Sequence, residues 1–567
     1  AFGADALTAN TTGASNTAVG AEALDANTTG TLNTSIGRES LSSNTTGTKN
    51  TAVGKSALQG NTTGDNNTAI GWDALNANTT ADFNVAVGNA ALALNTTGYS
   101  NTSVGYNALN ANTTGLGNVA LGQGSLSSNT TANDNTALGR ISLTNNTTGT
   151  RNTGVGRGAL NANTTAHDNA AVGYFSLYSN TTGTKNTGLG GYALQQNTTG
   201  NENVGTGYNA LGANTTGSNN IAIGNWALDA NTTASFNTAV GHQSLSTNST
   251  GSMNAAVGHQ ALFSNTTGSN NIAVGVYALD ANTTGNYNVA VGRNSLSSNT
   301  TASNNTAVGY YSLLTNTTGD NLVAVGRYAL KDNTTGVNNV AIGVTALEQN
   351  TTANNNTALG YAALTSNTTG TQNTAVGAYA MDVTTTGGYN SAFGVNALGD
   401  NTTASYNTAL GNAALNRNTT GSNNTAIGYA ALQENTSADF NTAVGATALD
   451  SCTTGSTNCA FGNGALNDVT TGSYNIGIGS RTGGFSTTLT TGNYNILIGN
   501  DAHTNGVNAA HQIVIGSNGD QGKGDNTAFI EPNGGGIYAG NNSSSLLTTS
   551  DRRIKKNIVN NTTGLDK

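Results

Sequence analysis

Hydrophobic and polar residues alternate along this chain in a unit of 17 residues. Numbered from its asparagine, each unit has one short apolar run at positions 2–4, usually Thr-Ala-Val or Thr-Ala-Ile, and another at positions 8 and 9, usually Ala-Leu. Asn-Thr-Thr-Gly at positions 12–15 is typical of a turn. Neither run is long enough for an ordinary helix, and the β-branched residues favour strand. The pattern predicts two strands of about four residues and two turns in each unit.

The spacing of the unit is constant over most of the chain. Its asparagine recurs every 17 residues from Asn16 to Asn475, and only Leu322 replaces it. Stacked coils need such a fixed period, because one inserted residue would break every row of side chains along the stack. The sequence therefore predicts an all-β fold, a β-solenoid (β-roll or β-helix) with one 17-residue coil per repeat. About 30 coils at ~4.8 Å would extend about 140 Å.

The repeat also predicts which positions form the core. Val, Ile or Leu recur at the fourth and ninth positions, and we expect both rows to stack inside the solenoid. The glycine at the fifth position indicates a backbone conformation closed to other residues. Asparagines at the first and twelfth positions can form hydrogen-bonded ladders between coils. About two large apolar side chains per coil make a thin core, which favours self-association, with a homotrimer as the expected state.

Composition excludes several classes of protein. The net charge is −9, only 8% of residues are charged, and no basic run suggests a nucleic-acid partner. No apolar stretch approaches the roughly 20 residues of a membrane span, and no signal peptide is visible. No calcium-binding repeat, phosphate loop or zinc spacing stands out, so we expect neither a metal nor a cofactor. Because Ala1 falls inside a repeat, we expect the chain to be part of something longer.

The pattern divides the chain into three regions. Residues 1–479 form the repeat shaft, and 480–549 are an irregular β transition region rich in Gly and Asn. Residues 550–567 differ in composition, with several Arg and Lys residues.

The two cysteines lie on either side of one turn. Cys452 replaces the twelfth-position Asn of its unit, and Cys459 replaces the second-position Thr of the next. A disulfide would require the two positions to face each other with Cα atoms about 5.5–6 Å apart, and would imply an oxidising location. The alternative is that both are small buried residues.

Asn-Thr-Ala-Val-Gly units of this kind resemble the repeats of bacterial and phage tail-fibre surface proteins. They are more distantly similar to the heads of trimeric autotransporter adhesins, whose unit is shorter. The resemblance implies a trimeric, extracellular fibre, on a cell surface or a virion tail, that serves as an adhesin or a spacer.

The last residues carry a second resemblance. The segment from Ser550 to Ile558 reads Ser-Asp-Arg-Arg-Ile-Lys-Lys-Asn-Ile, and Leu-Asp-Lys ends the chain. It resembles the start of the intramolecular chaperone domain of endosialidase-type phage tailspikes, with Ile554 where that family usually has Leu. In that family the domain drives trimerisation and then releases itself by cutting before the Ser. The resemblance implies that Ser550 is the nucleophile and Lys555 its base, a latent self-cleavage site in a domain that is incomplete here.

Bulky residues gather at the sixth and seventh positions, where stacking would arrange them in one stripe. Aromatic rings and Arg suit sugar stacking or contact with a protein receptor. A subunit interface and a solvated edge are the alternatives. The main candidates for this surface stripe are Trp72, Tyr106, Tyr174, Trp226, Tyr310 and Tyr328.

Three functions follow from these patterns. The first is a structural fibre or adhesin shaft, not an enzyme, that acts by reach and by multivalent contact with a cell-surface glycan or protein. The second is an ice- or mineral-surface binder, in which Asn27 and Thr29 illustrate a pair arrayed on one face. The third is a polysaccharide-degrading tailspike, which would need paired carboxylates, whereas residues such as Asp25, Asp73 and Asp229 occur singly.

Overall fold

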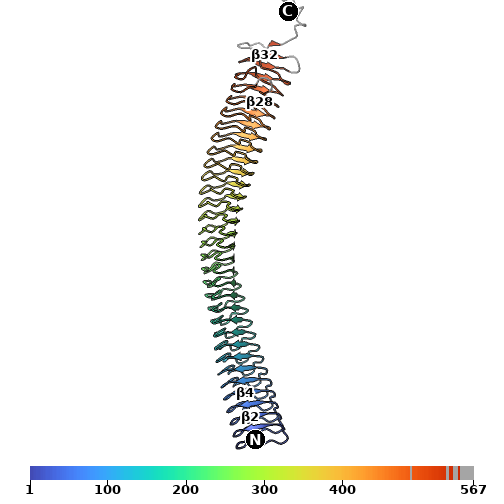
Figure 1. Cartoon of the computed structure of the whole chain (residues 1–567), viewed down its shortest axis with the longest axis vertical. Helices are drawn as coiled ribbons and strands as arrows, with labels where there is room; N and C mark the ends of the chain where they lie inside the picture. Colours follow the sequence, from blue (N-terminus) through green and yellow to red (C-terminus); the bar gives the residue numbers. More distant parts are fainter. Residues whose placement is uncertain (485–487, 532–535, 540–546, 549–567) are drawn as a thin grey trace, which may run out of the picture. The chain divides into compact units, whose positions relative to one another are not determined.

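The computed structural model describes residues 1–484, 488–531, 536–539 and 547–548. It consists of two units, divided between Asn288 and Val289. Each unit contains a parallel β-solenoid in which one 17-residue repeat makes one coil. The strands of neighbouring coils pair parallel and in register, as Thr238 does with Ala255 in the first unit and Thr306 with Val323 in the second. The predicted fold class is confirmed, and each strand can be followed onto the next in Figure 1, for example from β2 (Thr34–Ile36) to β4 (Thr68–Ile70).

The first unit has one strand of three residues in each coil. Its strands are β1 (Thr17–Val19), β2 (Thr34–Ile36), β3 (Thr51–Val53), β4 (Thr68–Ile70), β5 (Val85–Val87), β6 (Thr102–Val104), β7 (Val119–Leu121), β8 (Thr136–Leu138), β9 (Thr153–Val155), β10 (Ala170–Val172), β11 (Thr187–Leu189), β12 (Val204–Thr206), β13 (Ile221–Ile223), β14 (Thr238–Val240), β15 (Ala255–Val257) and β16 (Ile272–Val274).

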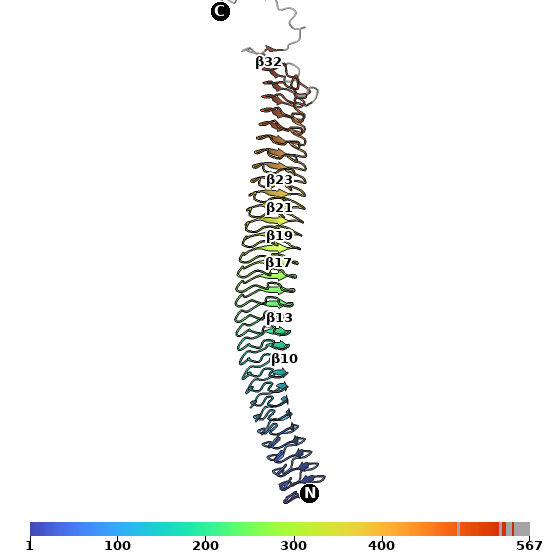
Figure 2. The ribbon, with the colours of Figure 1, turned by 60° about the vertical axis from the view of Figure 1, so that its left-hand side comes forward.

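The second unit has the same pattern, which Figure 2 shows most clearly between β17 and β23. Its strands are β17 (Val289–Val291), β18 (Thr306–Val308), β19 (Val323–Val325), β20 (Val340–Ile342), β21 (Thr357–Leu359), β22 (Thr374–Val376), β23 (Ser391–Phe393), β24 (Thr408–Leu410), β25 (Thr425–Ile427), β26 (Thr442–Val444), β27 (Cys459–Phe461), β28 (Ile476–Ile478), β29 (Ile496–Ile498), β30 (Ile513–Ile515), β31 (Ala528–Ile530), β32 (Ile537–Ala539) and β33 (Leu547–Thr548).

The prediction of two strands per coil is wrong. The second apolar run is a turn, in which the residues at positions 7 and 9 both take a left-handed backbone; in the first full coil these are Glu22 (φ 59°) and Leu24 (φ 56°). Two left-handed residues with one residue between them curl the chain tightly, so this run cannot extend into a strand. The curl directs Ala23 and Leu24 into the core, where both are buried.

The prediction for the fourth position is also wrong. Successive side chains of a strand point to opposite faces, and here the middle residue of the strand points inward. Ala18 is 1% exposed, whereas Val19, at the fourth position, is 39% exposed. The core of a coil therefore consists of the small third residue, the Ala-Leu pair of the turn, and two asparagines. A row of Val, Ile and Leu is left on the outside of the sheet.

The fifth-position glycine confirms its predicted role. At Gly241 φ is +134°, a conformation that residues with a Cβ rarely adopt. A Cβ at Gly241 would lie 2.5 Å from the carbonyl oxygen of Gly258 in the next coil. Both the dihedral angle and the close approach of two coils thus require glycine.

Both asparagine ladders are confirmed. At the twelfth position, Asn44 Nδ2 donates to Oδ1 of Asn27 in the previous coil at 2.8 Å, and also to the nearby carbonyl of Gly47 at 3.1 Å. At the first position, Oδ1 of Asn33 accepts the backbone N–H of Asn50 at 2.9 Å, and Asn50 Nδ2 donates to Gly64 O at 2.7 Å. These buried amides satisfy one another and so join neighbouring coils.

The regular spacing ends after β28. The paired strands β28 and β29 are 20 residues apart in sequence, β29 and β30 are 17 apart, and β30 and β31 are 15 apart. The strands β31, β32 and β33 then pair antiparallel. The described residues contain no helix with the length and apolarity that a membrane crossing requires.

Candidate functional site

The aromatic residues at positions 6 and 7 form a ladder in the first unit. Tyr174 and Tyr192 meet edge to face with ring centroids 5.4 Å apart, Tyr192 and Tyr208 at 5.6 Å, and Tyr208 and Trp226 at 5.3 Å. These separations are those of favourable aromatic pairs. The guanidinium of Arg157 lies 5.7 Å from the centroid of the Tyr174 ring, within the range of a cation–π contact. The structure thus brings two of the predicted stripe residues, Tyr174 and Trp226, together with Tyr192 and Tyr208 into one aromatic surface, in which Tyr192 is half-buried and the other three rings are exposed.

The other two stripe candidates of the first unit lie in coils nearer the N-terminus. Trp72 and Tyr106 are both exposed, and Lys55 Nζ lies 5.8 Å from the Trp72 ring. Each therefore presents a bulky ring at the same place in its coil as Tyr174. The stripe is a series of separate clusters.

The second unit has its own cluster at these positions. The rings of Tyr311 and Tyr328 stack with centroids 5.9 Å apart, and Tyr310 packs on both. Tyr310 is exposed and Tyr328 is half-buried. The guanidinium of Arg327 lies 5.1 Å from the Tyr328 ring. This cluster combines rings with a cation, as the cluster around Arg157 does.

Packing changes the ionisation of one ring in the first cluster. The pKa of the Tyr192 phenol is raised, chiefly by loss of hydration and then by the neighbouring Tyr174 and Tyr208. A tyrosine phenol is protonated at neutral pH in any case, so the shift extends to higher pH the range in which Tyr192 can donate a hydrogen bond.

A second outward row, at position 17, was missed by the sequence analysis. Tyr389 and Tyr406 stack there with centroids 4.9 Å apart, and Tyr474 and Tyr494 stack at 4.7 Å. Tyr494 in turn stacks on His511 at 4.9 Å. Position 17 has a left-handed backbone, as at Tyr389 (φ 60°), which directs the side chain outward. A scan of each repeat position for bulky residues would have found this row.

The same position carries alternating charges over four coils of the first unit. Arg151 Nε and Asp168 Oδ1 are 2.7 Å apart, and Lys185 Nζ and Glu202 Oε1 are 3.2 Å apart. The hydrogen bond from Arg151 is the main reason that the pKa of Asp168 is lowered. We call these four residues the charge ladder.

The two cysteines are free thiols in the structure. Cys452 is buried, and its Sγ donates to the carbonyl of Gly455 at 3.1 Å. Cys459 begins β27 and is half-buried, on the opposite side of the strand from the buried Ala460. Burial raises the pKa of Cys452 to about 12 and also raises that of Cys459. The structure does not join the two sulfurs, and the disulfide stays a prediction.

Two further sequence predictions concern other positions. Ser550 and Lys555 lie outside the described residues. The pair proposed for an ice-binding face does not share a face, because Asn27 is fully buried in its ladder whereas Thr29 is exposed. Among the described residues, no three His, Cys, Asp or Glu side chains gather to hold a metal ion.

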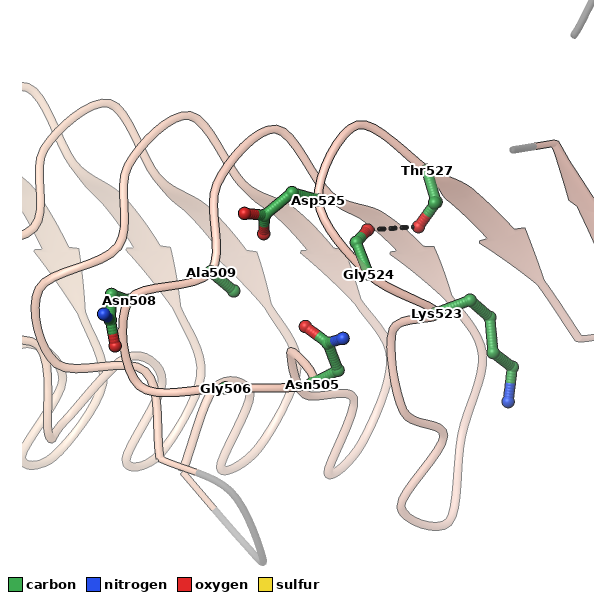
Figure 3. A pocket seen from close by; sticks show the side chains of 8 residues that line it. All are labelled: Asn505, Gly506, Asn508, Ala509, Lys523, Gly524, Asp525 and Thr527. Carbon is green, nitrogen blue, oxygen red and sulfur yellow. Dashed lines mark hydrogen bonds between the residues drawn. The ribbon is translucent and has the colours of Figure 1, made fainter. Parts of the chain in front are cut away.

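An open pocket of ≈ 560 Å³ lies near the C-terminal end of the second unit (Figure 3). Asp525 and Asn505 line it, but their oxygens accept hydrogen bonds from this chain: Asp525 Oδ1 from the N–H of Ala510, and Asn505 Oδ1 from Gln512. The Lys523 ammonium points away from both, and its Nζ lies 4.3 Å from the centroid of the Phe529 ring. The pocket therefore gathers no set of groups for catalysis.

Comparisons of the chain with protein-family models, with curated proteins and with solved structures found no match.

Proposed function

We propose that this chain is the shaft of an extracellular fibre, on a cell surface or a virion tail, that acts by reach and by multivalent surface contact. The observation that carries the proposal is the constant repeat, in which each coil places the same positions on the same outer rows. The Tyr174–Trp226 ladder is an example, because four successive coils each contribute a ring to it. Such a surface offers a partner many equivalent weak contacts.

The proposed partner of these rows is a cell-surface glycan or a protein receptor. Exposed rings flanked by Arg suit either, because sugar faces stack on aromatic rings and protein hot spots favour Tyr, Trp and Arg. The likeness of the repeat to tail-fibre proteins supports the same role, and the segment at Ser550 supports assembly through a chaperone domain.

The proposal gives the shaft no enzymatic role and makes the fibre a homotrimer. Glycoside hydrolysis needs two carboxylates within about 10 Å of each other. Asp229 accepts a hydrogen bond from Ser246. Asp65 and Asp82 do lie in neighbouring coils, but each accepts a backbone N–H of the preceding coil and so joins coils. Three copies of one repetitive surface would multiply its weak contacts.

The test is binding of the full chain to immobilised cell-surface glycans and to intact cells. The variant Tyr192→Ala/Tyr208→Ala/Trp226→Ala removes three rings of the ladder, and each ring contributes about 1 kcal/mol or more to a stacked contact. We expect retention to fall at least about tenfold. The matched control, Phe83→Ala, removes an exposed ring at position 17 of another coil. Equal retention of the native, variant and control chains would show that the ladder is not the binding surface. Absence of binding by the native chain to glycans and to cells would overturn the proposed adhesive role.

A further inference from the structure

One of the two outward rows of the parallel sheet is apolar along nearly the whole first unit. Two of the three residues of each strand point outward, at positions 2 and 4. Position 4 is Val, Ile or Leu in every strand from β1 to β16 except β12, which has Thr206. Position 2 is Thr, Val, Ile or Ala. We call these two rows the sheet face.

The exposure of this face is substantial. Ile223 is 42% exposed and Val257 is 39% exposed, and their neighbours in the row are similar. Neither row has a charged residue in β1–β16. Monomeric soluble proteins rarely leave a contiguous apolar patch of several hundred Å² in water, and larger ones mark interaction sites.

The residues on either side of the strand are of mixed character, with exposed charges among exposed rings. Position 6, just after the fifth-position glycine, carries exposed cations such as Arg38 and Arg140. Position 17, just before the first asparagine, carries Lys49 and the charge ladder. Protein–protein interfaces combine an apolar centre with charged and aromatic residues around it, and Tyr and Arg are enriched there.

We propose that the sheet face is the surface through which copies of this chain pack against one another. The partner must match a row of residues that repeats at the strand spacing of about 4.8 Å over 16 strands. A second copy has this period by construction, so contacts made at one coil recur at every coil. A globular partner would match only a few coils. The inference rests on the proposed self-associating fibre and identifies its interface.

The area of the face is sufficient for a stable assembly. Sixteen strands at ~4.8 Å and three residues at ~3.3 Å give a face of about 70 by 10 Å, or about 700 Å² per copy. Two copies would bury on the order of 1,400 Å² in the first unit alone, within the range of stable specific interfaces.

The chain itself supplies a mild substitution for the test. Thr206 shows that threonine is accepted at position 4, and it is nearly the same shape as valine. The variant Ile223→Thr/Val240→Thr/Val257→Thr/Val274→Thr therefore keeps the coil and removes apolar surface from the face. A control with Thr233→Ala and Thr250→Ala changes exposed residues at position 14 of the same stretch, in the turn away from the strand.

Molar mass would be measured by light scattering against concentration for the native chain and both variants, with circular dichroism to confirm the β-structure. We expect an oligomer for the native chain and the control, and a dissociation constant raised roughly 100-fold in the sheet-face variant. An oligomer that the sheet-face variant leaves unchanged would overturn this interface while keeping the fibre proposal. A native chain that is monomeric at all concentrations would overturn both.

Discussion

The twelfth-position asparagine ladder can be tested at one coil in the middle of the first unit. Asn231 is fully buried, and its Nδ2 donates to Asn214 Oδ1 at 2.8 Å and to Ala234 O at 3.0 Å. Its Oδ1 accepts from Asn248 Nδ2 at 3.1 Å. The substitution Asn231→Ala removes all three hydrogen bonds at once and leaves a polar cavity between three coils.

The expected loss follows from these bonds. A hydrogen bond contributes about 1 kcal/mol net, so three give about 3 kcal/mol for opening the coil. Ala234 O keeps its bond from Asn220 Nδ2 and Asn248 Nδ2 keeps its bond to Gly251 O, both at 2.9 Å. Asn214 Oδ1 loses the donor that faces it, and this buried acceptor makes the change costly.

Hydrogen–deuterium exchange followed by mass spectrometry suits this question, because a stack of coils opens locally and not in one step. We expect amides of the three coils around Asn231→Ala to exchange about 100-fold faster, since ~1.4 kcal/mol is a factor of ten. Amides of coils near Asn61 should keep their native rates.

The control for the ladder is Asn231→Thr. The chain itself has threonine at this position in one coil, where Oγ1 of Thr384 accepts from Asn401 Nδ2 at 3.3 Å. We therefore expect a smaller acceleration than for alanine. Equal exchange in the native and Asn231→Ala chains, or acceleration spread evenly over the chain, would refute the view that the ladder joins coils locally.

Three further predictions follow from other positions. Gly241→Ala should open the coils on both sides of Gly241, because a Cβ there would clash with Gly258 O. Gly191→Ala is the comparison, since Gly191 has an ordinary φ and a Cβ there would lie 3.6 Å from its nearest neighbour; similar exchange in both variants would contradict this. Burial raises the pKa of Asp229, so its ionised form costs stability at neutral pH and the cost disappears below the unfolded pKa of about 4. Asp229→Asn should therefore raise the thermal midpoint at pH 7 but not at pH 3, and a gain at both values would show that charge is not the cause. Iodoacetamide at pH 8 should alkylate Cys459 at least about 100-fold faster than the buried Cys452, because only the thiolate reacts. A native mass two hydrogens lighter, with neither thiol alkylated, would instead establish the predicted disulfide.

The one-coil-per-repeat architecture could be predicted from the sequence, because it follows from residues that recur at a fixed spacing. The asparagine at every seventeenth residue, the glycine four residues later and the buried amides all require one coil per repeat, and Asn33 and Gly241 behave as predicted. These features depend only on the 17-residue spacing, which can be read directly from the sequence.

The facing of the strand could not be predicted because a three-residue strand has two possible orientations. A shift of one residue exchanges the inner and outer faces. Hydrophobicity favours Val19 inside, but the left-handed turn brings Leu24 into the core, and the space that remains beneath the strand accepts the smaller Ala18. A left-handed leucine has no sequence signal, so the curl of positions 7–9 and the outward rows it produces became visible only in the structure.

The charge ladder has a consequence for how the chain finds its correct alignment. Because the coils are nearly alike, looping out one whole coil would let the asparagine and alanine rows re-form almost unchanged, and those rows alone cannot prevent such slippage. The four charges alternate in sign from coil to coil. If the coil that ends at Asp168 were skipped, Arg151 would face Lys185, and skipping the next would set Asp168 against Glu202. Opposed like charges make both slipped alignments unfavourable. These exposed ion pairs therefore favour the correct register in a stack whose coils are otherwise nearly identical.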